Sequence, residues 1–510
     1  MTVVDGVRHD TQLSHPLLTI NNYGSSSCRS RKMYTVQGIS PSGRTLKLND
    51  PDVNTLKTAL LERVFYHKVN GRYEEPHKPE YSLVVKRLRK FKQKVLACTG
   101  RVSCISPEEF AQMYTGRKRT IYDNAVERYN TIGVLRSDAV SDCFVKCEKV
   151  PFNKSPRCIQ PRKPVYNVGV GRYLKPVEHR IYKSIQRVFD SETPVVVKGF
   201  NAVTTAGIIR DKFEQFDNCV ALGLDASRFD QHVSESMLRW EHSIYNRLFN
   251  SSELAKLLTW QIDNVGRGHC EDGSLKYRVK GCRFSGDMNT ALGNCLIMCA
   301  MIHAFAEEVG VKINLANNGD DCVVFMDKKD LTRFQQPLDN WFHNMGFIMT
   351  SEAPVYNLHE IEFCQCKPVF GSNGLIMCRN VDKAREKDSM CMLDLSSELA
   401  ARKWLKAVGE CGLALCSGVP IMQELYSAYN RNGLKSNMTQ SVGWESGMYF
   451  MSKGLHARYT EVSEEARVSF YHSFGYTPDE QMALEEYYRG WNYTHLMSQE
   501  DLEHSTCAPF

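Results

Sequence analysis

The sequence predicts a mixed α+β protein with two or three subdomains. Its 510 residues exceed what one small core can hold. Residues 219–225 have the apolar pattern of a strand, and a helical pattern follows with Val233, Met237 and Trp240 on one face. In residues 315–325, apolar runs on both sides of a Gly-Asp turn predict a tight hairpin. Strands and helices therefore share the central region.

The composition indicates a soluble, mildly basic protein. Hydrophobic residues make up 42% of the chain, charged residues 24%, and the net charge is +6. This charge permits a polyanionic partner without requiring one. The 19 cysteines are mostly scattered singly, which favours free thiols in a reducing compartment. The longest apolar run, residues 295–306, is shorter than a bilayer span, so we expect a buried helix and no membrane segment.

Basic residues gather in the N-terminal part of the chain. One cluster, with Arg117 and Lys118, follows a glycine turn. The densest cluster spans residues 144–187, where 11 lysines and arginines stand against two glutamates. Five prolines and two glycines argue against one long helix there. We expect an extended or looped segment whose cations contact nucleic acid or nucleotides.

Three carboxylates are expected to meet near the hairpin. Asp225 ends the strand over residues 219–225, and Asp320 and Asp321 occupy the hairpin turn. Neighbouring carboxylates repel one another unless a cation lies between them, so a divalent metal is the natural partner. Two alternatives remain open: Asp225 could cap the helix that follows it, and Gly-Asp is also ordinary turn chemistry.

A polar row precedes the apolar run. Ser285 and Gly286 form a turn that opens a helix, and Thr290 and Asn294 lie four residues apart on one face of that helix. Small polar side chains in this arrangement suit a sugar hydroxyl. The alternative is a capping turn before a buried helix.

Three of these segments form an ordered set. Gly-Leu-Asp-Ala-Ser-Arg-Phe-Asp (223–230), Ser-Gly-Asp-Met-Asn-Thr-Ala-Leu-Gly-Asn (285–294) and Gly-Asp-Asp (319–321) occur in that order. Together they resemble motifs A, B and C of the RNA-dependent RNA polymerases of positive-strand plant viruses. The resemblance is greatest to the Tombusviridae, in particular to the readthrough portion of a carmovirus-like replicase. The basic segment 144–180 resembles motif F and the turn 362–365 resembles motif E, so the likeness covers about residues 110–370.

The resemblance implies a right-hand polymerase. Its fingers would comprise residues 1–205, its palm residues 206–375 with an antiparallel sheet plus helices, and its helical thumb residues 376–510. Asp225, Asp320 and Asp321 would be catalytic and would hold two Mg²⁺ ions, for which Mn²⁺ can substitute. The implied nucleotide-binding residues are Asp230, Ser285, Thr290 and Asn294 at the ribose and Lys149 and Arg157 at the triphosphate. The implied RNA-binding residues are Lys146, Arg162, Arg117, Lys118 and Gly286.

The expected activity is RNA-directed RNA polymerisation. The enzyme would replicate a positive-strand viral genome by template-directed, two-metal nucleotidyl transfer from ribonucleoside triphosphates, with primer-independent initiation. Expected partners are the viral RNA template and product, a membrane-anchored viral auxiliary replication protein and host factors. The expected location is the host cytoplasm, at replication sites on host membranes that are reached through that partner or through an N-terminal portion absent from this sequence.

Other functions compete with this expectation. A DNA-making polymerase would exclude the 2′-hydroxyl, a catalytically inactive RNA-binding scaffold would not need all three acids, and a metal-dependent nuclease would not need a triphosphate-binding wall. The proton donor for pyrophosphate is also open, because His343, Lys328 and Lys329 are all possible and none is favoured.

Overall fold

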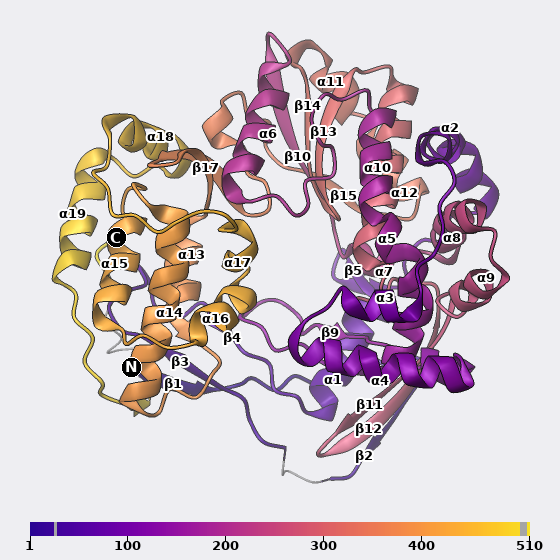
Figure 1. The fold of residues 1–510 in the computed structure, drawn as a ribbon, viewed down its shortest axis with the longest axis horizontal. Helices are drawn as coiled ribbons and strands as arrows, with labels where there is room; N and C mark the ends of the chain where they lie inside the picture. Colours follow the sequence, from indigo (N-terminus) through magenta and orange to yellow (C-terminus); the bar gives the residue numbers. More distant parts are fainter. Residues whose placement is uncertain (25–27, 500–506) are drawn as a thin grey trace.

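The computed structural model describes residues 1–24, 28–499 and 507–510. It confirms a mixed α+β protein (Figure 1). Two lobes lie on either side of a central four-stranded sheet, and N-terminal strands also run between the lobes at the opposite side of the molecule.

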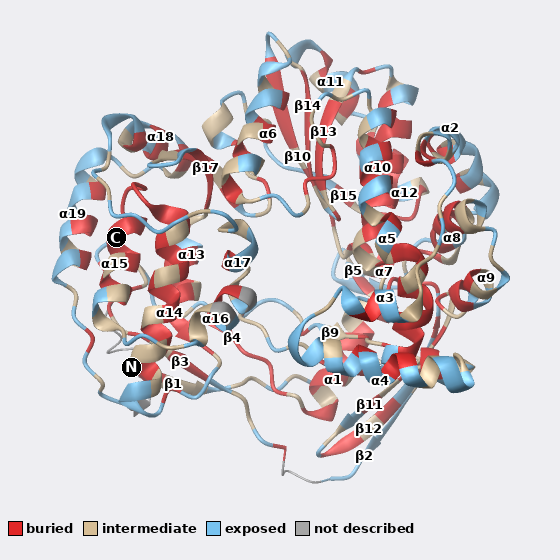
Figure 2. Ribbon diagram, in the orientation of Figure 1, coloured by how far each residue is buried: buried red, intermediate tan, exposed pale blue. Residues whose placement is uncertain are grey.

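The central sheet contains the two predicted strand elements. Its order is β13 (Ile313–Asn318), β14 (Asp321–Asp327), β10 (Cys219–Ala226) and β15 (Met349–Ser351), with antiparallel pairing throughout. Alternate residues of β10 point to opposite faces: Leu222 and Leu224 join the core that contains α10 (Thr290–Val309), and Ala221 joins the core that contains α6 (Ala202–Glu214). Both faces are covered, which explains the nearly continuous apolar strands (Figure 2).

Helix α10 extends the apolar run that was expected to be too short for a membrane. Its 20 residues make it the one helix in the described part of the chain that is long and apolar enough to cross a bilayer. However, 83% of its apolar window is buried inside the protein, against β13 and α2 (Tyr81–Thr99). Burial, rather than insufficient length, therefore supports the expectation of a core helix.

A second sheet, the basal sheet, supports one lobe. Its order is β2 (Leu18–Asn22), β12 (Gly273–Lys280), β11 (Asp263–Cys270), β7 (Ser141–Val145) and β9 (Cys158–Ile159). Strands β11 and β12 come from the middle of the sequence, yet they pair with strands from its first third. Strand pairing therefore crosses the boundary expected near residue 205.

A third sheet, the bridging sheet, joins the N-terminal strands to the other lobe. Its order is β18 (Met390–Cys391), β3 (Lys32–Thr35), β1 (Thr2–Asp5) and β19 (Ser498–Gln499). Met1, Tyr34 and Ile39 belong to the same core as α14 (Glu398–Cys416), α15 (Met422–Asn432) and α19 (Pro478–Gly490). The first residues thus pack with the C-terminal third, not only with the segment that follows them.

The densest basic segment corrects the expectation of an extended or looped chain. Its second half forms α5 (Pro164–Val188), a helix of 25 residues. Pro164 occupies the first turn, where a missing N–H costs nothing, and Pro176 is tolerated inside because most of the helix is buried. A Cβ at Gly171 would lie 2.3 Å from the Phe110 ring, so this glycine lets α5 approach α3 (Pro107–Gln112) closely. Tertiary packing overrides the local helix breakers.

The remaining elements complete the lobes. The helices are α1 (Val53–Leu60), α4 (Gly116–Ile132), α7 (Phe229–His232), α8 (Glu235–Phe249), α9 (Ser252–Thr259), α11 (Leu331–Gln335), α12 (Leu338–Asn344), α13 (Val381–Asp388), α16 (Met438–Ser446), α17 (Met448–Met451) and α18 (Glu464–Phe474). The strands are β4 (Leu46–Lys47), β8 (Val150–Pro151), β5 (His67–Val69), β6 (Arg72–Glu74), β16 (Cys366–Gly371) and β17 (Gly374–Arg379).

Candidate active site

The three predicted carboxylates lie at one end of the central sheet. Gly319 and Asp320 form the two-residue connection between β13 and β14, and Gly319 has φ +69°, a conformation that glycine adopts without strain. The register of β10 and β14 places Asp225 directly opposite Asp321. The alternative role for Asp225 as a helix cap is wrong, because Ser234 caps α8 and α7 begins only after Arg228.

The electrostatics of this end of the sheet favour a cation. Partial burial raises the pKa of Asp320, and the Asp225 carboxylate adds to the rise. Partial burial also raises the pKa of Asp321 to about 6, with a further contribution from Asp320. Within the described residues, none of these three carboxylates forms an ion pair with lysine or arginine. A divalent cation would relieve both the repulsion and the cost of burial.

The donor set fits a hard cation. All three side chains offer carboxylate oxygens, which Mg²⁺ and Mn²⁺ prefer. Across residues 1–24, 28–499 and 507–510, no group of three or more histidine, cysteine, aspartate or glutamate side chains is arranged so that it could hold a metal ion. Magnesium sites on phosphate substrates usually combine one or two carboxylates with substrate oxygens and water, so these acids would not have to form a complete site by themselves.

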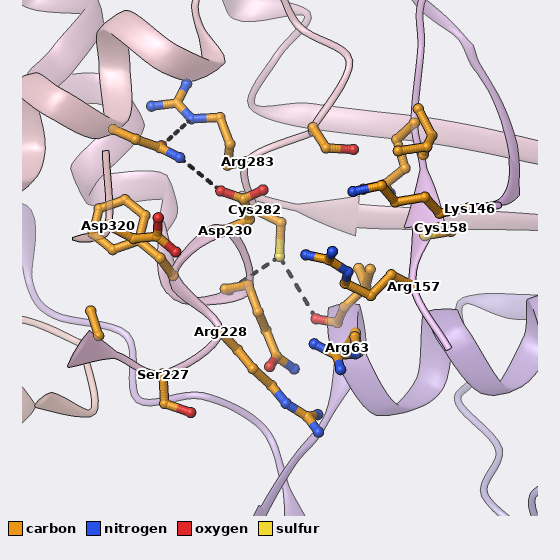
Figure 3. Close-up of a pocket in the computed structure, with 18 of the residues that line it drawn as sticks. Arg63, Lys146, Arg157, Cys158, Ser227, Arg228, Asp230, Cys282, Arg283 and Asp320 are labelled. Atoms are coloured by element: carbon orange, nitrogen blue, oxygen red, sulfur yellow. Dashed lines mark hydrogen bonds between the residues drawn. The ribbon is translucent and has the colours of Figure 1, made fainter. Parts of the chain in front are cut away.

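A cavity of about 480 Å³ begins at the acids. Figure 3 shows Asp230 and Asp320 on one side of it and Arg157, Arg63 and Lys146 across from them. Cations facing carboxylates over an open space provide a place for a metal-bound polyphosphate. The cations that line the cavity are Arg63, Lys146, Lys154, Arg157, Arg228 and Arg283.

Pairing of β7 with β9 presents Lys146 and Arg157 together. Val145 pairs with Cys158, and the N–H of Lys146 donates to the carbonyl of Arg157 at 2.9 Å. Both side chains also bind Glu148: Lys146 Nζ lies 3.1 Å from its carboxylate, and Arg157 Nε donates to it at 2.6 Å. The glutamate therefore orients the two cations.

Three further arginines and one lysine that line the cavity were missed from the sequence, namely Arg63, Arg228, Arg283 and Lys154. Burial, together with nearby Arg228 and Arg157, lowers the pKa of Arg63 to about 10. Arg228 adopts φ +49°, and its guanidinium donates to the carbonyl of Glu62. Arg228 lies inside the segment 223–230 that resembles motif A, so the sequence offered a reason to predict it as a site residue. Arg63 lies in an ordinary helical pattern, and nothing in the sequence near it indicates a binding site.

Lys149 does not lie where it was predicted. Its Nζ donates to the carbonyls of Lys387 and Met390 at 2.7 and 2.6 Å, and it lines a different cavity beside α13 and α14. The expectation that Lys149 binds the triphosphate is therefore corrected: it ties the basic segment to the C-terminal lobe. Lys146, which was expected to contact RNA, faces the acids instead.

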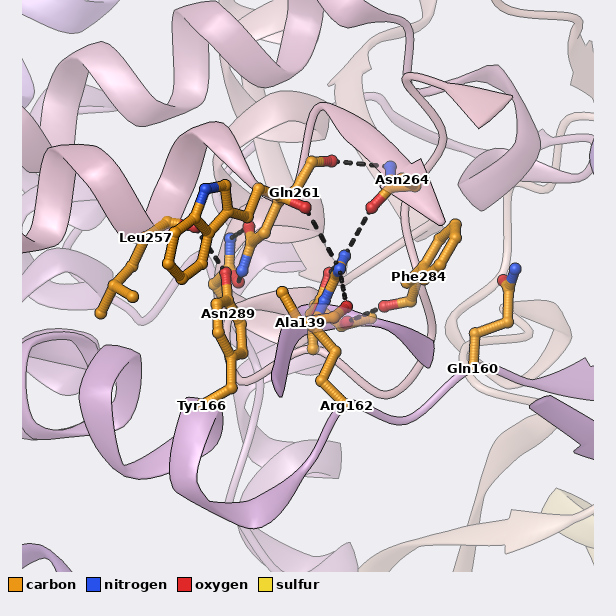
Figure 4. Close-up of polar contacts among 12 residues, drawn as sticks. Ala139, Gln160, Arg162, Tyr166, Leu257, Gln261, Asn264, Phe284 and Asn289 are labelled. Carbon is orange, nitrogen blue, oxygen red and sulfur yellow. Dashed lines mark hydrogen bonds and ion pairs between the residues drawn. The ribbon is translucent and has the colours of Figure 1, made fainter. Parts of the chain in front are cut away.

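Arg162 is also corrected, because its side chain is completely buried. Figure 4 shows it among its polar contacts. Its guanidinium makes two bonds to Asp287, at 2.5 and 3.1 Å, and one to Asn264 at 2.7 Å. It also donates to the carbonyls of Ala139 and Trp260. With all its donors engaged, Arg162 cannot contact RNA; it joins α5 to the turn before α10.

Two other predicted RNA contacts, Arg117 and Lys118, lie in the exposed first turn of α4. The Lys118 ammonium lies 4.8 Å from the centroid of the Tyr114 ring. Neither residue lines the two cavities that contain Asp320, so RNA contact by these residues stays a prediction.

Most of the predicted ribose-binding residues converge. Asp230, Ser285 and Asn294 all line the 480 Å³ cavity, and Asn294 Nδ2 donates to Asp230 Oδ1 at 2.8 Å. Thr290 shares a helix face with Asn294, as predicted, but lines only a second cavity, and its hydroxyl donates to the carbonyl of Phe284 at 2.7 Å.

Gly286 touches protein rather than open space. A Cβ there would lie 2.6 Å from Pro161 Cα and 2.8 Å from the carbonyl oxygen of Gln160. The expected role of Gly286 in RNA binding therefore has a competing explanation, namely close contact between the turn that precedes α10 and the segment that follows β9.

The second cavity, of about 580 Å³, lies on the other side of the hairpin turn. Asp320 and Asp321 line it together with Lys175 and Lys198, which were not predicted. Lys198 is held near the turn because the neighbouring Val197 N–H donates to the carbonyl of Asn317 at 2.8 Å. The turn at residues 362–365 is adjacent: the N–H of Cys364 donates to Asp321 Oδ2 at 3.0 Å.

The three possible proton donors lie away from both cavities. Of the described residues that line them, none is His343, Lys328 or Lys329. His343 stacks on His77, and the Lys328 ammonium lies 5.1 Å from the centroid of the Tyr356 ring. The proton donor is therefore unassigned.

Comparison with known proteins gives consistent matches over nearly the whole chain. Residues 20–495 match the family described as viral RNA dependent RNA polymerase. The chain is 40% identical to the RNA-directed RNA polymerase of Turnip crinkle virus over 467 residues, which cover 90% of this chain and 60% of that relative. It is 40% identical to that of Maize chlorotic mottle virus, covering 95% and 50%, and 37% identical to that of Tomato bushy stunt virus, covering 94% and 59%. The chain thus spans about half to three-fifths of the length of these relatives.

Proposed function

This chain belongs to the family of viral RNA-dependent RNA polymerases, and on that premise we propose that it is an RNA-directed RNA polymerase that replicates a positive-strand viral genome from ribonucleoside triphosphates. The observation that carries the proposal is one cavity in which Asp225 and Asp320 face a wall of arginine and lysine side chains. Nucleotidyl transfer needs both parts, because a charged triphosphate has to be held while charge develops on its leaving group.

We propose that the protein is a right-hand polymerase. The central sheet with α6 and α10 would form the palm, the lobe on the basal sheet the fingers, and the lobe of α14, α15, α18 and α19 the thumb. The strand order supports this division better than it supports the expected division into residues 1–205, 206–375 and 376–510. Strands β11 and β12 belong to the second of these segments but pair with strands of the first. The bridging sheet would then connect the fingers to the thumb.

The acids would hold the metal. Asp225 and Asp320, assisted by Asp321, would bind two magnesium ions, with manganese as a substitute. When bound, these ions supply activation of the attacking 3′-oxygen and stabilisation of the departing pyrophosphate. Arg157 and Lys146, already oriented by Glu148, would take the triphosphate oxygens and align the α-phosphate with the acids.

The ribose would be recognised beside the acids. Asp230, Ser285 and Asn294 offer a carboxylate, a hydroxyl and an amide to the sugar within the same cavity. The 2′-hydroxyl both donates and accepts hydrogen bonds, so polar groups placed for it reject a deoxyribose that leaves them unpaired.

The biological setting is also a proposal. Because its motifs resemble those of the polymerases of Tombusviridae, we propose primer-independent initiation, a membrane-anchored viral auxiliary protein and host factors as partners, and recruitment to host membranes in the cytoplasm. Recruitment would occur through that partner or through a segment that precedes this sequence in a longer product.

Nucleotide incorporation on a short RNA template tests the proposal. The wild-type protein should extend a labelled primer in magnesium, and Asp320→Ala should reduce incorporation to background. Asp327→Ala is the matched control, because Asp327 lies at the far end of β14, outside both cavities. Equal product from wild type and Asp320→Ala would refute the assigned site, and cleavage of labelled RNA without nucleotides would indicate a nuclease.

A further inference from the structure

A closed circuit of hydrogen bonds joins Asp230, Arg283 and Asn294 (Figure 3). The backbone N–H of Arg283 donates to the carbonyl of Asp230 at 2.9 Å. Arg283 Nε donates to Asn294 Oδ1 at 3.0 Å, and Asn294 Nδ2 donates to Asp230 Oδ1 at 2.8 Å. Helix α7, which contains Asp230, and helix α10, which contains Asn294, are therefore connected through one arginine.

Arg283 determines which way the Asn294 amide points. The two ends of an asparagine amide have the same shape but opposite hydrogen-bonding character. A guanidinium only donates, so the end that faces Arg283 has to be the oxygen. The NH₂ end is then directed to Asp230, where it occupies Oδ1. Within the described residues, Asp230 Oδ2 accepts no hydrogen bond and is left for a ligand.

Glu241, on α8, holds the arginine in place. Arg283 Nη2 forms an ion pair with Glu241, and both side chains are completely buried. The same carboxylate accepts from Tyr245 Oη at 2.6 Å and from Asn289 Nδ2 at 2.8 Å. A buried carboxylate with three donors has one stable arrangement, so the guanidinium it pairs with is held rigidly.

The space for this ion pair comes from Gly293. A Cβ at that position would lie 2.2 Å from Arg283 Nη2 and 2.4 Å from Glu241 Oε2. Gly293 also precedes Asn294 on α10, so the residue that accommodates the ion pair is next to the residue that the arginine orients.

We propose that Arg283 and Glu241 are positioning residues for ribose recognition: they fix the Asn294 amide so that Asp230 Oδ2 receives the 2′-hydroxyl of the incoming nucleotide. The inference rests on the proposed polymerase function and extends it beyond the residues that contact the sugar. A 2′-deoxynucleotide leaves the partly buried Asp230 oxygen without a donor, and it is rejected for that reason. When the amide is no longer fixed, the ribonucleotide loses much of its advantage.

Selection between ATP and 2′-dATP tests the proposal. We would measure kcat/KM for single-nucleotide incorporation on an RNA template with the full chain and with Arg283→Lys, Glu241→Gln and Asn294→Ala. The ratio of kcat/KM for ATP to kcat/KM for 2′-dATP should fall about 10–100-fold in each variant, because the loss of one hydrogen bond to a charged group changes a rate or binding constant by about that factor. The fall should arise mainly from a higher KM for ATP. Arg283→Lys combined with Asn294→Ala should lose no more than either alone, because both act on one contact.

A matched control separates positioning from general destabilisation. Glu485→Gln disrupts another ion pair with a buried carboxylate, Arg467–Glu485, between α18 and α19. It should lower the unfolding temperature without changing the ATP to 2′-dATP ratio. Glu241→Gln preserves the size of the side chain, so it remains informative if Arg283→Lys does not fold.

The outcomes distinguish this inference from the function on which it rests. An unchanged ratio in folded, active Arg283→Lys and Glu241→Gln overturns the positioning role and leaves the polymerase intact. An equal fall of the ratio in Glu485→Gln also overturns it, since any loss of stability would then suffice. A wild-type protein that incorporates neither nucleotide refutes the polymerase function and the inference together.

Discussion

Replacing Gly286 with alanine should lower the catalytic activity strongly while the protein remains folded. The new Cβ would lie 2.6 Å from Pro161 Cα and 2.8 Å from the carbonyl oxygen of Gln160. Both are backbone atoms, which cannot rotate away as the end of a side chain can. Ordinary contact begins at 3.4 Å, so the two loops have to separate by roughly 0.8 Å.

This displacement falls between the two walls of the cavity. The segment at residues 160–161 continues from Arg157, and Gly286 is next to Ser285, which lines the cavity together with Asp230 and Asn294. Overpacking of this kind costs about 1–3 kcal/mol of stability. A misplacement approaching 1 Å costs a reaction on the order of 10–100-fold, because the reacting atoms are no longer aligned. We therefore expect a 10–100-fold loss of kcat/KM in a protein that remains folded.

Single-nucleotide incorporation and thermal unfolding measure the two effects on the same preparations. Gly207→Ala is the matched control, because Gly207 lies in helix α6 and a Cβ added there would meet no atom of the described residues within 4 Å. That change should leave activity intact and add about 0.5–1 kcal/mol of stability. Activity of Gly286→Ala within threefold of wild type would show that the close backbone contact does not align the site.

Four other changes test the two corrected residues and two residues of the candidate site. Arg162→Ala should lower the free energy of unfolding by about 3–5 kcal/mol in urea titrations, because it leaves the Asp287 carboxylate buried and unpaired; a loss below 1 kcal/mol would contradict that burial. Lys149→Met should lower the free energy of unfolding by about 2–4 kcal/mol, because two hydrogen bonds to carbonyls are lost. It should change the KM for nucleotides little. Arg157→Ala should instead raise the KM for nucleotides at least tenfold. Asp321 has a pKa of about 6 in the folded protein, above its ordinary 3.8, so the folded state binds more protons between these values and stability falls as pH rises through them. Thermal unfolding in the presence of a chelator should therefore show Asp321→Asn to be more stable than wild type at pH 7 by roughly 1–3 kcal/mol. This gain in stability should disappear near pH 4. A freely solvated Asp321 carboxylate would give no gain at either pH.

The acids could be predicted because their placement depends on local rules. A two-residue turn determines where Asp320 and Asp321 point, and a strand that ends in Asp225 needs only to pair beside the hairpin to complete the set. The mixed fold follows from periodicity, and the buried helix α10 follows from the continuous apolar run at residues 295–306.

The cations could not be assigned by the same reasoning. Lys146 and Lys149 lie three residues apart in one basic segment, and only the tertiary structure shows that the first faces the acids and the second faces α13. Arg162 lies in the same basic, proline-containing segment as Arg157. However, it is buried against Asp287, a partner 125 positions away in the sequence. A count of charges cannot distinguish a lining residue from a structural one, because that difference depends on long-range partners.

The bridging sheet has a consequence for how the protein is made on the ribosome. Strand β1 (Thr2–Asp5) is synthesised about 490 residues before its neighbour β19 (Ser498–Gln499). At about 5–20 residues per second, β1 waits roughly 25–100 s for that partner. Meanwhile β1 and β3 each retain an edge that the finished sheet will cover, and unpaired edges are templates for aggregation. This sheet therefore cannot be completed until the segment that contains β19 has been synthesised.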